Sequence, residues 1–110
     1  MPAIIHADGA QVWCKHDKYH RDGDLPAVIH ADGAQAWYKH DKCHRDGDLP
    51  SVIHADGGQE WFQHGNRHRD NDNPAKITST YTEWYKNDRL YRTNYCSIQP
   101  PTYSYPKNDF

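Results

Sequence analysis

Apolar and polar residues alternate in short runs along residues 2–92, and turn residues interrupt these runs about every seven or eight positions. No segment places apolar residues at i, i+3, i+4 and i+7, the spacing that is typical of an amphipathic helix. An alternation of period two, bounded by Gly, Asp and Asn, predicts short β-strands joined by tight turns. We therefore expect an all-β chain.

A 24-residue unit carries this pattern and occurs three times almost letter for letter, followed by a shortened fourth copy. The units occupy residues 2–25, 26–49, 50–73 and 74–92, and residues 93–110 break the period. Self-similarity at this period is typical of solenoids, in which each unit packs on its neighbours. The expected fold is a single-layer antiparallel β-meander or solenoid of hairpin repeats, about four in residues 1–92, with an extended Pro- and Tyr-rich arm over 93–110.

The first recurring turn is Ala-Asp-Gly, at residues 7–9 in the first unit. Read as a three-residue loop with Gly9 in the left-handed region, it pairs Ile5 with Gln11. The fourth unit is one residue shorter here, and a two-residue Ser79-Thr80 loop pairs Ile77 with Thr82. Both loops place the Ile and the Trp of a unit on one face. We expect this Ile–Trp–His face to be the packing face, because a one-residue slip would invert it.

The second recurring turn is His16-Asp17, which becomes His-Asp, His-Gly and Asn-Asp in the later units. All of these residue types tolerate the positive φ of a two-residue hairpin loop. A hairpin closed by this turn predicts cross-strand pairs that are aromatic or oppositely charged. The pairs are Trp13 with His20, Trp37 with His44, Trp61 with His68, Trp84 with Tyr91, Glu60 with Arg69, and Glu83 with Arg92.

The repeated pattern Trp-Tyr-x-His/Asn-Gly/Asp-x-x-His-Arg-x-Asp-Gly-x-x-Pro-Ala-x-Ile resembles the variant MORN repeats that are common in proteins of large DNA viruses of amoebae. The resemblance covers residues 2–92, and His-Asp stands where the family more often has Asn-Gly. It implies an elongated, twisted single-layer sheet with scaffold or attachment roles, and no catalytic residues. It also implies a capsid-associated, minor virion component or a protein of the viral factory.

Composition adds that the core must be thin and aromatic. Only 35% of the 110 residues are hydrophobic, but the chain holds four Trp, eight Tyr and two Phe. Each aromatic side chain buries about 150–250 Å², so a thin sheet can be stabilised by them.

The charge of the chain limits the classes of partner it can bind, and its cysteines indicate the cellular compartment. The net charge of −2 and the absence of a basic run argue against nucleic-acid binding, and no apolar stretch approaches the length of a membrane span. Met1-Pro2-Ala3 has no signal-peptide character. Cys14, Cys43 and Cys96 are irregularly placed, which argues against a disulfide framework and for a reducing, cytoplasmic compartment.

Histidines, aspartates and the His-Arg-Asp triplets are the candidates for chemistry. The triplets resemble a kinase catalytic loop, but the other kinase motifs are missing. Equivalent histidines lie about 9–10 Å apart, too far to share one metal ion, although unlike histidines are not excluded as ligands. We expect His20, His44 and His68 to pack on Trp. The paired aspartates of each unit are expected to form turn hydrogen bonds rather than a calcium site. The pairs are Asp22 with Asp24, Asp46 with Asp48, and Asp70 with Asp72.

The segment Pro100-Pro101-Thr102-Tyr103 matches the PPxY ligand of WW domains, which bind such peptides as a polyproline II helix. The alternative is an extended arm that covers the edge of the last strand or lies along a neighbouring molecule.

The sequence thus favours a non-enzymatic structural or scaffold protein that contacts other protein chains, either capsid proteins or copies of itself, and needs no cofactor. Open sheet edges are expected to pair with a partner. The alternative is a ligand-binding module that holds a metal at His residues or recruits a WW domain. A third hypothesis is a response to pH through the nine histidines. The candidate protein-binding residues are Trp13, Trp37, Trp61, Trp84, Pro100, Pro101 and Tyr103.

Overall fold

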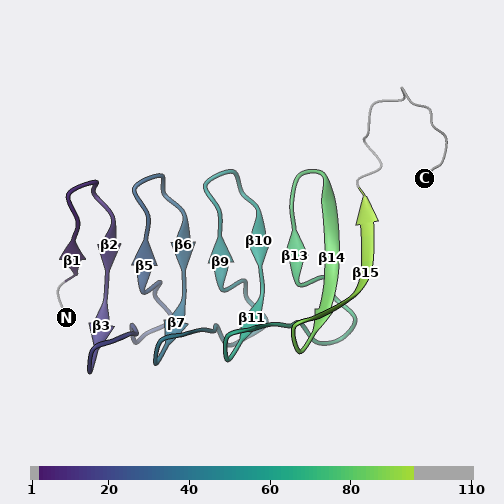
Figure 1. Cartoon of the computed structure of the whole chain (residues 1–110), viewed down its shortest axis with the longest axis horizontal. Coiled ribbons are helices and arrows are strands. Elements are labelled where there is room, and N and C mark those ends of the chain that lie inside the picture. Colours follow the sequence, from purple (N-terminus) through teal and green to yellow (C-terminus); the bar gives the residue numbers. More distant parts are fainter. Residues whose placement is uncertain (1–2, 96–110) are drawn as a thin grey trace.

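The computed structural model describes residues 3–95, and in this range the chain is all-β (Figure 1). The molecule measures 53 × 31 × 17 Å and has a radius of gyration of 16.6 Å. A compact domain of about 100 residues has a radius of gyration near 13 Å, so the fold is elongated. The described part contains no helix, and hence none long and apolar enough to cross a membrane.

Most strands belong to one antiparallel sheet of nine strands, in the order β1-β2-β5-β6-β9-β10-β13-β14-β15. Its strands follow one another along the long axis of the molecule (Figure 1). They are β1 (Ile4–Ile5), β2 (Gln11–Val12), β5 (Val28–Ile29), β6 (Gln35–Ala36), β9 (Val52–Ile53), β10 (Gln59–Glu60), β13 (Lys76–Ile77), β14 (Tyr81–Lys86) and β15 (Arg89–Tyr95).

The remaining strands form three separate two-stranded hairpins, one in each of the first three units. They are β3 (Cys14–Lys15) with β4 (Lys18–Tyr19), β7 (Tyr38–Lys39) with β8 (Lys42–Cys43), and β11 (Phe62–Gln63) with β12 (Asn66–Arg67). His16 and Asp17 join the first of them with φ of 54° and 64°. The predicted two-residue turn is therefore confirmed, and the backbone of His20 donates to that of Trp13 at 3.1 Å as the predicted pairing requires.

The Ala-Asp-Gly loop also has the predicted geometry. Ile5 pairs with Gln11, and Gly9 has φ of 95°. The Asp8 carboxylate accepts a hydrogen bond from the backbone N–H of Ala10 at 2.9 Å, which stabilises the loop. In the fourth unit, Ile77 pairs with Thr82 across Ser79-Thr80, so the shorter loop keeps the same register.

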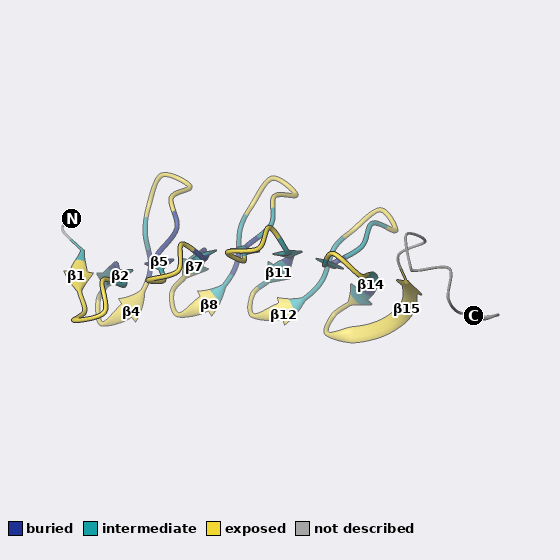
Figure 2. Cartoon of the chain, turned by 90° about the horizontal axis from the view of Figure 1, so that it is seen from above, coloured by how far each residue is buried: buried dark blue, intermediate teal, exposed yellow. Residues whose placement is uncertain are grey.

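The packing face differs from the expectation in its Ile residues. Val12, Val28 and Ala36 pair in one row and form the buried cluster, with Tyr38 and Val52 against it. Neighbouring residues of a strand point to opposite faces, so the Ile row lies on the other side of the sheet. There Ile29, Ile53 and Ile77 are half-buried, and only Ile5, on the end strand, is largely exposed. Burial runs along the middle of the molecule, whereas the loops and the end strands β1 and β15 are exposed (Figure 2).

The fourth hairpin contains a β-bulge that corrects two predicted pairs. Trp84 pairs with Arg92 rather than with Tyr91, and Glu83 pairs with Thr93 rather than with Arg92. The extra residue is Tyr91, whose hydroxyl donates to the Asp72 carboxylate at 2.9 Å. Strand β15 continues to Tyr95, so the first three residues of the predicted arm belong to the sheet, and the rest of the arm lies outside the described residues.

The predicted pair of Glu60 with Arg69 is also wrong. Glu60 stands in the buried row between Val52 and Lys76, and it is only 7% exposed. His54 donates to its carboxylate at 2.6 Å, and the Arg67 guanidinium forms a second, short ion pair with it. Burial raises the pKa of the Glu60 carboxyl, but the hydrogen bonds from His54 and Arg67 outweigh burial and hold the pKa below its usual 4.5.

We predict that Glu60→Gln destabilises the fold by about 1–2 kcal/mol at pH 7, because charge-assisted hydrogen bonds are lost in a buried place. A depressed pKa in the folded state stabilises the fold above the unfolded pKa, and this contribution disappears as the pH falls through the folded pKa. The difference in unfolding free energy between wild type and variant should therefore shrink below pH 4.5. A denaturant series at several pH values measures it. Glu83→Gln is the control, and a difference that stays constant to about pH 3 would contradict the assignment.

Candidate functional site

The four tryptophans are the most regularly placed functional candidates, and all are buried, with exposed fractions of 5–8%. Three of them are fixed by the preceding unit. The indole N–H groups of Trp37, Trp61 and Trp84 donate to the backbone carbonyls of Asp24, Asp48 and Asp72 at 3.1, 3.1 and 2.9 Å.

The three aspartates adopt φ of 55–57°, a left-handed conformation that Asp tolerates better than most residues. This conformation occurs in the loop that leads from one unit to the next. Each tryptophan is therefore held by the loop of the unit before it.

An arginine lies over each tryptophan ring. Its guanidinium carbon is 3.6–4.0 Å from the ring centroid in the pairs Arg21–Trp13, Arg45–Trp37, Arg69–Trp61 and Arg92–Trp84. We expected a histidine in this position, and that expectation is wrong. The planar guanidinium stacks on the indole and still offers its N–H groups at its rim, which an imidazole cannot do as fully.

The same arginine binds the carboxylate of the preceding unit's aspartate. Arg45 donates from Nε to Asp24 at 2.9 Å and from Nη2 at 3.3 Å, and Arg69 does the same to Asp48. Arg92 reaches Asp72 at 3.4 Å. Each aspartate thus holds the next unit twice, the Trp through its carbonyl and the Arg through its carboxylate. We call this the Asp–Trp–Arg contact.

His20, His44 and His68 form a second contact between units. Their Nδ1 atoms accept backbone N–H groups of the next unit's turn, from His40 at 3.2 Å, His64 at 3.0 Å and Asn87 at 2.9 Å. Their Nε2 atoms therefore carry the proton and donate to Asp22, Asp46 and Asp70 at 2.7–2.8 Å. Both ring nitrogens are occupied.

Because both ring nitrogens of His20, His44 and His68 are hydrogen-bonded, these imidazoles have no nitrogen free to bind the metal ion of the alternative hypothesis. Within residues 3–95, no three His, Cys, Asp or Glu side chains are arranged to hold a metal ion. The ring centroids of His20 and His40 lie 4.5 Å apart, as do those of His44 and His64, so histidine rings of adjacent units pack on each other in a tilted arrangement.

The first aspartate of each pair supports the histidine instead of forming the expected turn hydrogen bond. In the second unit, Lys39 and His44 both donate to Asp46, at 2.9 and 2.7 Å, and together they lower its pKa to about 2. In the first unit, the hydrogen bond from His20, together with the charge of Lys15, lowers the pKa of Asp22.

A third contact joins the hairpin turns. Asp41 donates its backbone N–H to the carbonyl of Tyr19 at 2.9 Å, and its carboxylate accepts the N–H of Tyr19 at 3.1 Å. Asp88 makes the same two bonds with Arg67. Gly65 keeps only the backbone bond, to Cys43. The turn residues are thus selected for contact with the preceding unit as well as for positive φ.

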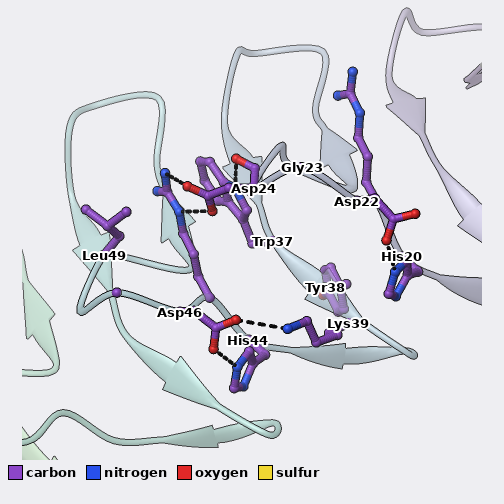
Figure 3. A pocket seen from close by; sticks show the side chains of 13 residues that line it. His20, Asp22, Gly23, Asp24, Trp37, Tyr38, Lys39, His44, Asp46 and Leu49 are labelled. Carbon is purple, nitrogen blue, oxygen red and sulfur yellow. Dashed lines mark hydrogen bonds and ion pairs between the residues drawn. The ribbon is translucent and has the colours of Figure 1, made fainter.

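These contacts leave a groove of about 520 Å³ between the first and second units (Figure 3). Asp24 and Trp37 lie in the upper part of this view, and Lys39, His44 and Asp46 in the lower part (Figure 3). Most charged groups that line the groove pair with a neighbouring charge or carboxylate, whereas Arg21, within residues 3–95, donates only to the Pro26 carbonyl. The arrangement can hold protein segments together, but it offers no nucleophile with a base beside it.

The sequence located the tryptophans and their arginines but did not show that aspartates of one unit bind the next. A signal was present, because Asp24 and Arg45 are 21 residues apart and Asp48 and Arg69 repeat that spacing.

The other predicted binding residues, Pro100, Pro101 and Tyr103, lie outside the part of the chain that the structure describes. Cys14 and Cys43 are free thiols, and burial raises the pKa of Cys43.

No family model matches the chain, and no curated protein or solved structure is significantly similar to it.

We predict that the Arg69–Asp48 ion pair contributes about 0.5–1 kcal/mol, the upper part of the range for exposed pairs, because it is bidentate and one partner is largely buried. A double-mutant cycle with Asp48→Asn and Arg69→Gln measures this coupling in unfolding free energy. Lys15→Gln, which breaks an exposed 3.4 Å pair, should change stability by less than about 0.5 kcal/mol. A coupling of zero between Asp48 and Arg69 would contradict the assignment.

We also predict that His44 is a neutral ring protonated at Nε2, which its ¹⁵N chemical shifts report directly. His44→Leu should cost about 1–3 kcal/mol, because it leaves the N–H of His64 without an acceptor. His44→Asn should recover part of this loss, since its side-chain oxygen can replace Nδ1. A ring protonated at Nδ1 at neutral pH would be incompatible with the hydrogen bond.

Proposed function

We propose that this chain is a non-enzymatic structural protein, a solenoid of MORN-like hairpin repeats that holds other protein chains in a larger assembly. The way its charged groups are used supports this proposal. The repeated Arg, His and Asp residues bind neighbouring units, and both ring nitrogens of the histidines that line the groove between the first two units are hydrogen-bonded.

The observation that carries the proposal is the exposure of the two end strands. All seven residues of β15 are exposed, including Leu90 at 49% and Tyr95 at 67%. At the other end, Ile4 and Ile5 of β1 are 55% and 68% exposed. Sheet edges with unpaired backbone groups and apolar side chains favour pairing with another chain.

The buried tryptophans act in this proposal by fixing the units, and the exposed contact surface is provided by the edges. The MORN-like sequence pattern favours a scaffold or attachment role, including one as a minor virion component bound to capsid proteins. The second candidate is recruitment of a WW domain through Pro100, Pro101 and Tyr103, which only the sequence motif favours.

Edge substitutions test the assembly role. Ile5→Lys and Tyr95→Lys add charge to the two end strands without touching the Asp–Trp–Arg contacts, so we expect an unchanged melting temperature. In extracts of the cells that make this protein, wild type should sediment with a mass well above that of one chain. The double variant should shift toward the monomer.

The matched control is Ser79→Lys, in an exposed loop away from both edges, which should sediment as wild type does. Monomeric wild type in the extract, with amides of β1 and β15 that resist hydrogen exchange, would contradict the proposal.

A further inference from the structure

The second, third and fourth units each present a similar set of groups to the unit before them, except that Gly65 in the third unit has no carboxylate. In the second unit this set is the indole N–H of Trp37, the guanidinium of Arg45, the backbone N–H of His40, and the N–H and carboxylate of Asp41. The preceding unit supplies the complement. It consists of a left-handed Asp with its carbonyl and carboxylate, an imidazole Nδ1, and one strand residue with free backbone groups.

The first unit has the same set in the same conformation. Arg21 stacks on Trp13 at 3.6 Å and donates from Nη1 to the carbonyl of Pro26, as Arg45 does to Pro50. His16 and Asp17 have φ of 54° and 64°, close to the 51° and 74° of His40 and Asp41. Among residues 3–95, no carboxylate binds Arg21 and no acceptor binds the Trp13 indole.

A cavity of about 220 Å³ lies against Trp13 and Arg21 of this set, and it matches half of the groove between the first two units. Every residue that lines it has its counterpart 24 positions later in the larger groove. The counterparts are Trp13 and Trp37, His20 and His44, Arg21 and Arg45, Asp22 and Asp46, and Leu25 and Leu49. The missing half of the larger groove is the aspartate loop of a preceding unit.

We infer that Trp13, His16, Asp17 and Arg21 form a docking site for a partner chain that carries a unit of the same chemistry, with a left-handed aspartate in an Arg-Asp-Gly-Asp-Leu-Pro loop. The inference rests on the proposed function and specifies the partner at this end of the molecule. The charge fits, because the site offers a cation and an N–H to a carboxylate and a carbonyl.

A second copy of this chain is not the occupant. Its fourth unit has Tyr91 in the position of the histidine and Tyr95 in the position of the aspartate, so it offers neither an imidazole nor a carboxylate there. Tyr91 itself is bonded to Asp72. Asp24, Asp48 and Asp72 already bind arginines within the chain. The two ends of the described part are therefore not complementary.

The test is a titration of the ¹⁵N-labelled protein with the peptide Arg-Asp-Gly-Asp-Leu-Pro-Ala, blocked at both ends, which has the sequence of residues 21–27. The indole N–H resonance of Trp13 should shift and saturate, while those of Trp37, Trp61 and Trp84 stay in place because their acceptors are occupied. Replacing the second Asp of the peptide by Asn should weaken binding about five-fold, which corresponds to the loss of one good ion pair.

Arg21→Gln should weaken binding by a similar factor, and Arg89→Gln, at the far end, should leave it unchanged. Three indole resonances in their wild-type positions show that the variants are folded. Equal shifts of all four indoles, no shift of Trp13, or equal binding of the Asn peptide would overturn the inference. Concentration-dependent self-association that shifts Trp13 without peptide would overturn the choice of occupant. The sedimentation of the edge variants is measured separately, so the assembly role can survive the failure of this site.

Discussion

An aspartate in a left-handed turn places its carbonyl and its carboxylate on the same neighbour, and the rest of this molecule depends on that geometry. Asp24 holds Trp37 through one group and Arg45 through the other, and Arg45 covers the face of Trp37. Because the arginine also binds the carbonyl of Pro50, the contact reaches the start of the following unit. Two successive units are thereby fixed by one loop.

This arrangement explains how so polar a chain builds an ordered sheet. The strands of the first three units are only two residues long, and the apolar cluster is small. Each ion pair or stacking contact contributes about 1 kcal/mol or less, but the contacts recur with every unit. Contacts at different boundaries lie far apart, so their contributions to stability should add. The fourth unit keeps the Trp and Arg, so the Asp–Trp–Arg contact occurs at all three boundaries between units, as do the histidine contact and the backbone bond of the turns.

The turns and the short-range register could be predicted from the sequence because they depend on local backbone chemistry. Gly9, His16 and Asp17 have the positive φ that their residue types indicated. The bulge at Tyr91 could not be predicted, because it depends on Asp72, 19 residues away. The prediction that His rather than Arg lies over the Trp ring failed for the same reason. Pairing within a hairpin places His20 opposite Trp13, whereas the position of the arginine is set by an aspartate of another unit.

The most direct test of this account is the rate of hydrogen exchange at the four indole N–H groups of the free protein. The contacts predict slow exchange for Trp37, Trp61 and Trp84, which donate to the carbonyls of Asp24, Asp48 and Asp72, and fast exchange for Trp13. All four rings are similarly buried, so burial alone would give four similar rates. Similar rates for the four indoles would contradict the claim that the aspartate loops hold the tryptophans.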